Sequence, residues 1–223
     1  MNYQKKIEMK HKIRIAAFTI MILLYGTSSL LSSGPDLALL SIFNPKEIEK
    51  DFKSLGISHQ QVFQIDKKKY VLSGFDDSEE NERDYGIRLF VIEGNKVLFR
   101  SKGMMDSWYL NLTFFKSKAF NDKMLILGEG GDEGGSYGIS VFEMTQSKVK
   151  RIGYINASIW DNNENILSAV PFVKIAESTY GYIITFSRDV TIQDKQTYEY
   201  KTINKQSIRY IYEGKEDIIE IIE

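Results

Sequence analysis

The chain has 223 residues, of which 43% are hydrophobic and 13% are aromatic, and its formal net charge at pH 7 is −1. This near-neutral composition lacks the basic footprint of a nucleic-acid-binding protein, so we expect no nucleic-acid partner. The absence of cysteine excludes disulfides, cysteine nucleophiles, zinc–thiolate sites and a lipidated cysteine, so the fold must rest on apolar burial alone.

The N-terminal residues 1–33 have the order of a secretory signal. Basic residues precede an uncharged apolar run, Ile15–Tyr25, and small residues follow it. The apolar run is about 11 residues long, or about 17 with Leu30 and Leu31, whereas a membrane-spanning helix needs about 20. We therefore expect a signal peptide, with a membrane anchor over residues 13–31 as the alternative. In either case we expect an exported protein, periplasmic or extracellular, that meets a membrane only through an uncleaved N-terminus.

Residues 34–58 are predicted to be a linker and one short helix. Asn44 can cap the helix, Pro45 suits its first position, and Glu47 completes a capping box. The helix is expected to end near Leu55, before Gly56, and to cover a sheet edge.

Residues 59–223 predict an all-β domain. The order of strand, strand, acidic or polar loop, strand, tight turn and strand recurs three times, which indicates repeated supersecondary units. We expect three antiparallel four-stranded units of the propeller-blade type. Because propellers have about four to eight blades, closure would need a fourth, degenerate unit, and an open arrangement is the alternative. The expected strands are Gln60–Ile65, Tyr70–Phe75, Ile87–Ile92 and Val97–Ser101; Tyr109–Phe115, Met124–Gly128, Ile139–Met144 and Val149–Tyr154; Ala169–Ile175, Tyr182–Phe186, Tyr198–Ile203 and Ile208–Tyr212; and a terminal strand, Ile218–Ile222.

The second unit has a limited resemblance to a known repeat. Asn121–Gly128, the Gly-rich stretch after it, and Tyr137–Phe142 are similar to one blade of the FG-GAP type of β-propeller repeat. The calcium loop of that family is absent, since only Asn121 and Asp122 stand in its place. The resemblance therefore implies a blade and neither a calcium site nor an integrin-like function.

Two acidic segments are the candidate binding sites. The stretch Gly128–Gly135 carries Glu129, Asp132 and Glu133 among five glycines, and we expect a flexible loop over Glu129–Ser136. Asp76, Asp77 and Glu79 occupy the matching place in the first unit. A solvated loop is the simplest interpretation of both segments. The alternative is a shared acidic rim that attracts a basic partner or a cation.

No motif for catalysis accompanies these segments. His59 is the one histidine beyond the N-terminal region, and no Gly-x-Ser-x-Gly sequence is present. Trp108 and Trp160 stand at matching positions between units, which favours packing. We therefore expect a non-enzymatic, exported binding protein with a protein or glycan partner and no cofactor, calcium being left open. The alternative is a secreted hydrolase that cleaves glycans with carboxylates.

Overall fold

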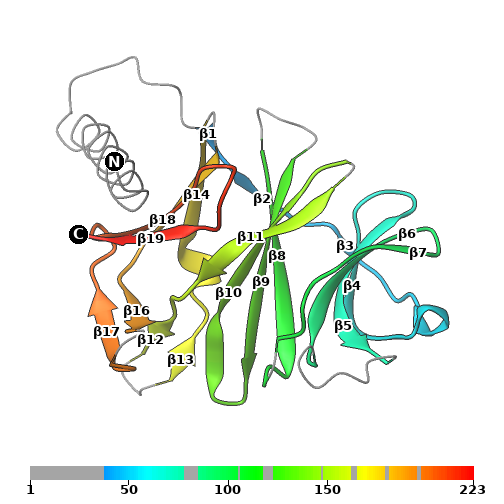
Figure 1. Cartoon of the computed structure of the whole chain (residues 1–223), viewed down its shortest axis with the longest axis horizontal. Helices are drawn as coiled ribbons and strands as arrows, with labels where there is room; N and C mark the ends of the chain where they lie inside the picture. Colours follow the sequence, from blue (N-terminus) through cyan, green and yellow to red (C-terminus); the bar gives the residue numbers. More distant parts are fainter. Residues whose placement is uncertain are drawn as a thin grey trace, which may run out of the picture. The chain divides into compact units, whose positions relative to one another are not determined.

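The chain divides into two compact units, Met1–Asp36 and Leu37–Glu223. The computed structural model describes residues 38–77, 85–104, 106–117, 123–146, 148–161, 165–178, 181–194 and 197–223. The expected signal or anchor, residues 1–33, lies outside these ranges. The described residues form strands and short 3-10 turns, with no α-helix among them, and their curled sheets form a half-barrel (Figure 1). The all-β prediction is thereby confirmed, while the repeat and its propeller-blade form stay predictions.

The first sheet has five strands in the order β3-β4-β5-β6-β7. Its four main strands run antiparallel in chain order, within three residues of the bounds expected from alternating apolar residues. The strands are β3 (Lys46–Glu47), β4 (Ile57–Gln64), β5 (Lys69–Asp76), β6 (Arg88–Glu93) and β7 (Lys96–Arg100).

The second sheet has seven strands and is built on the meander β8-β9-β10-β11. β9 and β10 are longer than expected and take in most of the glycine-rich stretch. The strands are β2 (Ser41–Phe43), β8 (Tyr109–Lys116), β9 (Met124–Asp132), β10 (Gly135–Met144), β11 (Val149–Ile155), β12 (Ile159–Trp160) and β13 (Ile166–Leu167).

The third sheet has five strands in the order β1-β14-β15-β18-β19, and a two-stranded ribbon, β16-β17, is inserted between β15 and β18. The expected position of Tyr198–Ile203 beside Tyr182–Phe186 is wrong, because β17 pairs with β16 and β18 takes the place next to β15. Val190 and Ile192 in β16 alternate toward the core, so part of the expected loop 187–196 is a strand. The strands are β1 (Ala38–Leu39), β14 (Val173–Ser178), β15 (Gly181–Phe186), β16 (Val190–Gln193), β17 (Tyr200–Ile203), β18 (Ile208–Tyr212) and β19 (Ile219–Ile222).

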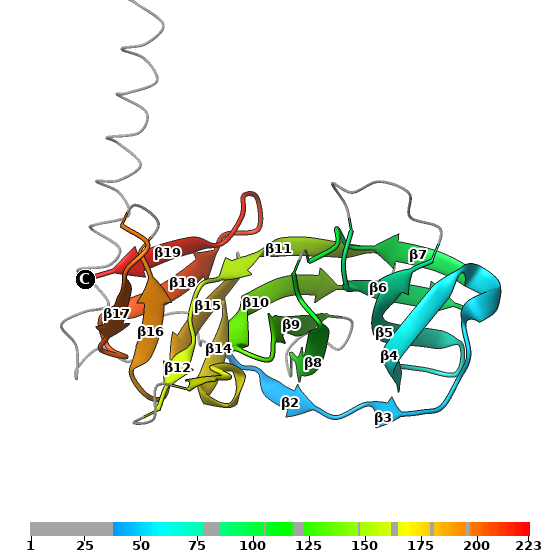
Figure 2. The same cartoon turned by 90° about the horizontal axis from the view of Figure 1, so that it is seen from below.

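One N-terminal segment, residues 38–47, adds a strand to each of the three sheets, and we call it the strap. β1 pairs with β14, β2 with β8 and β3 with β4, so the strap lies beside the first main strand of every sheet. Figure 2 shows β2 and β3 in blue as they pass from the second sheet to the first. The strap therefore protects the outer backbone groups of three strands at once.

The expected helix from Asn44 to Leu55 is wrong. Lys46 and Glu47 pair with β4, and the amide of Ile48 donates to the carbonyl of Val62 at 2.9 Å. Only η1 (Lys53–Leu55), a 3-10 turn ended by Gly56 in the left-handed conformation, has helical character. An isolated helix of this length is marginal, and pairing with a sheet edge satisfies the same backbone groups.

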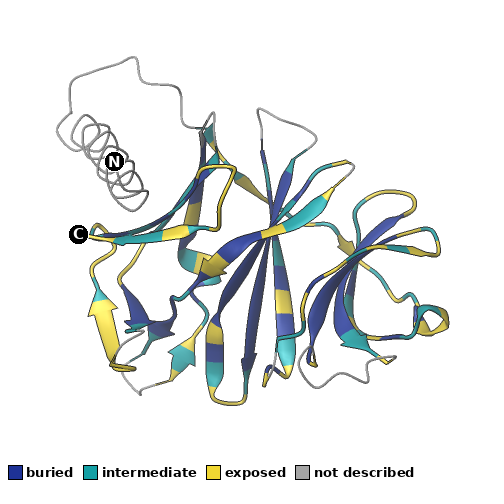
Figure 3. Ribbon diagram, viewed as in Figure 1, coloured by how far each residue is buried: buried dark blue, intermediate teal, exposed yellow. Residues whose placement is uncertain are grey.

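Buried side chains form three apolar clusters. Figure 3 shows the buried residues in dark blue along the strands. The largest contains Leu125 and Leu127 of the second sheet with Ile175 and Ile184 of the third. A second joins the first and second sheets, and a third lies on the other face of the first sheet against Phe52. Sheet faces packed on one another thus supply the burial that the cysteine-free sequence requires.

Candidate functional site

The glycine-rich acidic stretch is a β-hairpin and not a loop. β9 runs to Asp132, β10 starts at Gly135, and Glu133 and Gly134 make the turn between them. Glu129 therefore lies inside a strand, whereas Asp132 and Glu133 lie at its tip. The expectation of a Glu129–Ser136 loop failed because the glycines make room for neighbours. A Cβ on Gly131 would lie 2.3 Å from the Tyr109 hydroxyl oxygen.

Asp132 is held in place by two donors. Its Oδ1 accepts the backbone amide of Gly134 at 2.7 Å, and its Oδ2 accepts the hydroxyl of Tyr137. These bonds, the one from Tyr137 first, lower the pKa of Asp132. The same carboxylate raises the pKa of Tyr137 to about 12. Asp132 is thus a fixed negative charge at neutral pH.

Further acidic and aromatic side chains surround this carboxylate. Trp108 is 62% exposed and Tyr137 is 43% exposed, and the amide of Trp108 donates to the carbonyl of Gly131 at 2.7 Å. Asp106 also raises the pKa of Tyr137 through its charge, so it lies close to that phenol. We call the following set the acidic–aromatic patch: Asp106, Trp108, Tyr109, Asp132, Glu133 and Tyr137.

Glu129 lies beneath this patch. It is only 4% exposed, and its Oε1 has no hydrogen-bond partner among the described residues. Burial, followed by the charges of Glu129 and Asp132, raises the pKa of Tyr109. The Glu129 side chain is therefore not accessible to a partner itself.

The first acidic segment lies in a different sheet. Asp76 ends β5 and forms an ion pair with Arg100, while Asp77 accepts the hydroxyl of Ser58 at 2.7 Å. Glu79 lies outside the described residues. Figure 1 shows that β5 and β9 end on the same side of this unit, at the lower edge of the view. The shared acidic rim stays a prediction.

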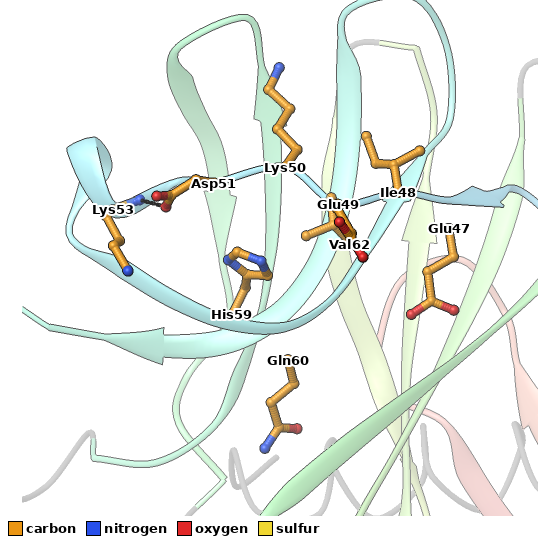
Figure 4. A pocket seen from close by; sticks show the side chains of 9 residues that line it. All are labelled: Glu47, Ile48, Glu49, Lys50, Asp51, Lys53, His59, Gln60 and Val62. Carbon is orange, nitrogen blue, oxygen red and sulfur yellow. Dashed lines mark hydrogen bonds between the residues drawn. The ribbon is translucent and has the colours of Figure 1, made fainter.

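An open groove of about 690 Å³ lies on the first sheet (Figure 4). Charged residues of both signs line it, including Glu47, Lys50 and Asp51, and His59 stands in its middle with its ring 6.3 Å from that of Phe52. Gln60 lines the same groove and donates to the Trp108 carbonyl at 2.6 Å, which ties the first sheet to the patch.

Among the residues that the structure describes, no three acidic or histidine side chains gather closely enough to hold a metal ion. Comparisons with protein families, curated proteins and solved structures gave no significant match.

Sequence reasoning did not foresee the aromatic half of the patch. Trp108 was expected to pack between units, yet it lies largely in solvent. Tyr137 carried no signal of its own, because only the hairpin brings it to Asp132, and Asp106 approaches Tyr137 only because β8 pairs with β9. A separation of five residues between Asp132 and Tyr137 indicates a contact only once it is known that a two-residue turn lies between them.

Proposed function

We propose that this protein is an exported, non-enzymatic binding protein that contacts its partner through the acidic–aromatic patch. The observation that carries this proposal is the exposure of Trp108 and Tyr137 beside Asp132 on a hydrogen-bonded hairpin. Large exposed aromatic side chains are common anchors of binding surfaces. Because the hairpin is already ordered, little conformational entropy is lost on contact.

The partner that best suits this surface is a protein segment rich in lysine or arginine. A cation can lie over the Trp108 ring, an arrangement that stabilises by about 0.5–2 kcal/mol. Asp132 and Glu133 offer carboxylates to the same cation. A glycan partner would use the aromatic rings but would depend less on these two carboxylates.

Export is the second part of the proposal and rests on residues 1–33. Cell fractionation followed by mass measurement of the mature chain tests it. A periplasmic or extracellular chain that has lost the first 33 residues or so supports cleavage. A full-length chain in the membrane fraction supports the anchor over residues 13–31, and a cytoplasmic full-length chain contradicts export.

We also propose that the three meanders are versions of one repeated, propeller-blade-like unit. Supporting this, each contains four antiparallel strands and each takes one strap strand beside its first strand. An experimental structure in which the meanders fail to superpose over four strands would remove this part of the proposal.

Binding is tested with a synthetic peptide rich in lysine and arginine and with a glutamine-substituted peptide of equal length. Trp108 fluorescence reports the titration in a Trp160→Phe background, because the chain has two tryptophans. We expect Asp132→Asn with Glu133→Gln to weaken binding by about tenfold or more, as for residues at the centre of an interface. The matched control Glu216→Gln removes an exposed acid elsewhere and should change little.

Equal binding of the basic peptide by the double variant would overturn the proposal. Equal binding of the glutamine peptide would show that charge does not direct recognition. If the unmodified protein cleaves a glycan from a test panel and Asp132→Asn does not, the result would instead support the alternative, a secreted glycan hydrolase.

A further inference from the structure

A second surface groove, lined by residues other than those of the acidic–aromatic patch, lies at the end of the β16-β17 ribbon. It is a groove of about 320 Å³, near the lower end of the range for small-molecule sites. Its lining is Ile159, Trp160, Arg188, Asp189, Thr191, Thr202 and Lys205. None of these residues belongs to the patch, so a ligand here would be recognised by different chemistry.

The ribbon and β12 build one wall of this groove. Ser158, which precedes β12, exchanges backbone hydrogen bonds with Thr191 at 2.9 and 2.8 Å, and Thr191 pairs with Thr202 across the ribbon. This register places Trp160 on the same face as the two threonines. The ring of Trp160 packs against that of Tyr200 with centroids 4.8 Å apart. Trp160 thus lines the groove next to Thr202 and the largely buried Thr191, with Tyr200 supporting its ring from outside the lining.

Cationic groups line the groove at the end of the ribbon, just before β16 and just after β17. The guanidinium of Arg188 lies over the Phe172 ring at 4.9 Å, and the structure describes no hydrogen bond or ion pair for it. Lys205 Nζ lies 3.4 Å from the carbonyl of Ser187, next to Arg188 in the chain. Asp189 supplies one negative charge, and its Oδ1 already accepts the backbone amide of Lys205 at 3.0 Å. The groove thus has a net positive charge and a planar donor free to pair with an anion.

We propose that this groove binds an acidic sugar, a hydroxylated six-membered ring that carries a carboxylate. The ring would lie against Trp160, since aromatic side chains suit the apolar faces of such rings. The carboxylate would pair with the Arg188 guanidinium, whose parallel donors match two carboxylate oxygens. Thr202, Asp189 and Lys205 would contact the hydroxyl groups. A neutral sugar would lack the pairing with Arg188, and inorganic phosphate would lack the ring.

The two tryptophans allow a direct test. In a Trp108→Phe background only Trp160 emits, and the protein is titrated with glucuronate and with a short oligomer of it. We expect a saturable change in emission, binding of glucose at least about tenfold weaker, and binding of inorganic phosphate that leaves the emission unchanged. Arg188→Ala should weaken glucuronate binding by about tenfold or more, and Arg188→Lys by less.

Lys215→Ala, which removes an exposed cation from the turn before β19, is the matched control and should bind as tightly as the background. Arg188 is exposed, so its variants should keep the unfolding midpoint of the background protein, and that midpoint is measured first. Absence of a saturable response, equal affinity for glucose, or equal binding by Arg188→Ala would each overturn the proposal. Because basic-peptide binding is read from Trp108, its failure leaves this test unaffected.

Discussion

At the scale of residues, glycine is required where a neighbouring atom lies too close to the backbone for a Cβ to fit. The Tyr109 ring lies over Gly131 and the Tyr154 ring lies over Gly138, with no room for a Cβ in either place. The hydroxyl of Tyr154 donates to the carbonyl of Tyr137, so this packing also holds the patch in position. Glycine is thus needed at these two positions mainly because the neighbouring aromatic rings leave no room for a Cβ, and less because of the turn.

We expect Gly131→Ala to destabilise the protein by about 1–3 kcal/mol, the usual cost of overpacking. Its Cβ would lie 2.1 Å from the carbonyl oxygen of Gly135, a backbone atom fixed by strand pairing. Urea unfolding measures the loss. Gly134→Ala, in the exposed turn, should cost much less, because its nearest neighbour is a side-chain oxygen of Asp132 at 3.1 Å. Equal losses for the two variants would contradict this account.

At the scale of elements, the strap is the part most dependent on its partners. It consists of strands of only two or three residues, too short to be stable by themselves. Each gains its structure by pairing with a longer strand. Leu40, between β1 and β2, also packs against the largest cluster and donates its amide to the carbonyl of Ile175 at 2.9 Å.

We expect Leu40→Pro to lower the free energy of unfolding by about 3 kcal/mol, because proline removes this donor and the Leu40 side chain leaves the core. Leu39→Pro is the matched control. Amides alternate in direction along a strand, so the Leu39 amide faces away from β14. Leu39 is also 62% exposed, so its replacement should cost less. Thermal and urea unfolding compare the two variants, and a larger loss in Leu39→Pro would refute the pairing.

The first two meanders were predictable because local signals agree there. Apolar runs such as Met124–Leu127, with a polar turn after each partner strand, indicate the strands without tertiary information. The strap was not predictable, because nothing in residues 38–47 indicates which sheet edges are vacant. Asn44, Pro45 and Glu47 even favour a helix, which edge pairing replaces. In the patch, sequence reasoning identified Asp132 and Glu133 but not Trp108 or Tyr137, whose positions depend on the hairpin register.

At the scale of the whole molecule, buried tyrosines join neighbouring sheets. The hydroxyl of Tyr182 in β15 donates to Glu143 of the second sheet at 2.9 Å. The hydroxyl of Tyr210 in β18 lies 3.1 Å from the carbonyl of Asn156 and 2.6 Å from Glu220. Burial first, and then the nearby carboxylates, raise the pKa of both phenols above the ordinary 10.0. The sheets are thus held together by phenols that must stay protonated.

The folded protein should therefore lose stability in alkali. A raised pKa in the folded state gives stability that is fully present below pH 10 and is lost as the pH rises above it, because only the unfolded chain then releases the proton. Each such phenol contributes a decline of about 1.4 kcal/mol per pH unit. Urea unfolding at neutral pH and one unit above 10.0 measures it. The decline should be smaller in Tyr182→Phe and unchanged in Tyr198→Phe, which removes an exposed phenol; an unchanged decline in Tyr182→Phe would contradict the assignment.

The strap also sets the order in which the chain can fold. Ala38 is synthesised before any sheet exists, yet its partner Glu177 belongs to a strand that is made only after the main strands of the first two sheets. Closing such a long loop is costly in entropy and slows folding relative to local hairpins. Until β14 emerges, β1 has no strand to pair with, and Leu40 lacks the apolar cluster against which it packs. A nascent chain of this kind is therefore expected to complete its local hairpins first and the pairing of β1 with β14 last.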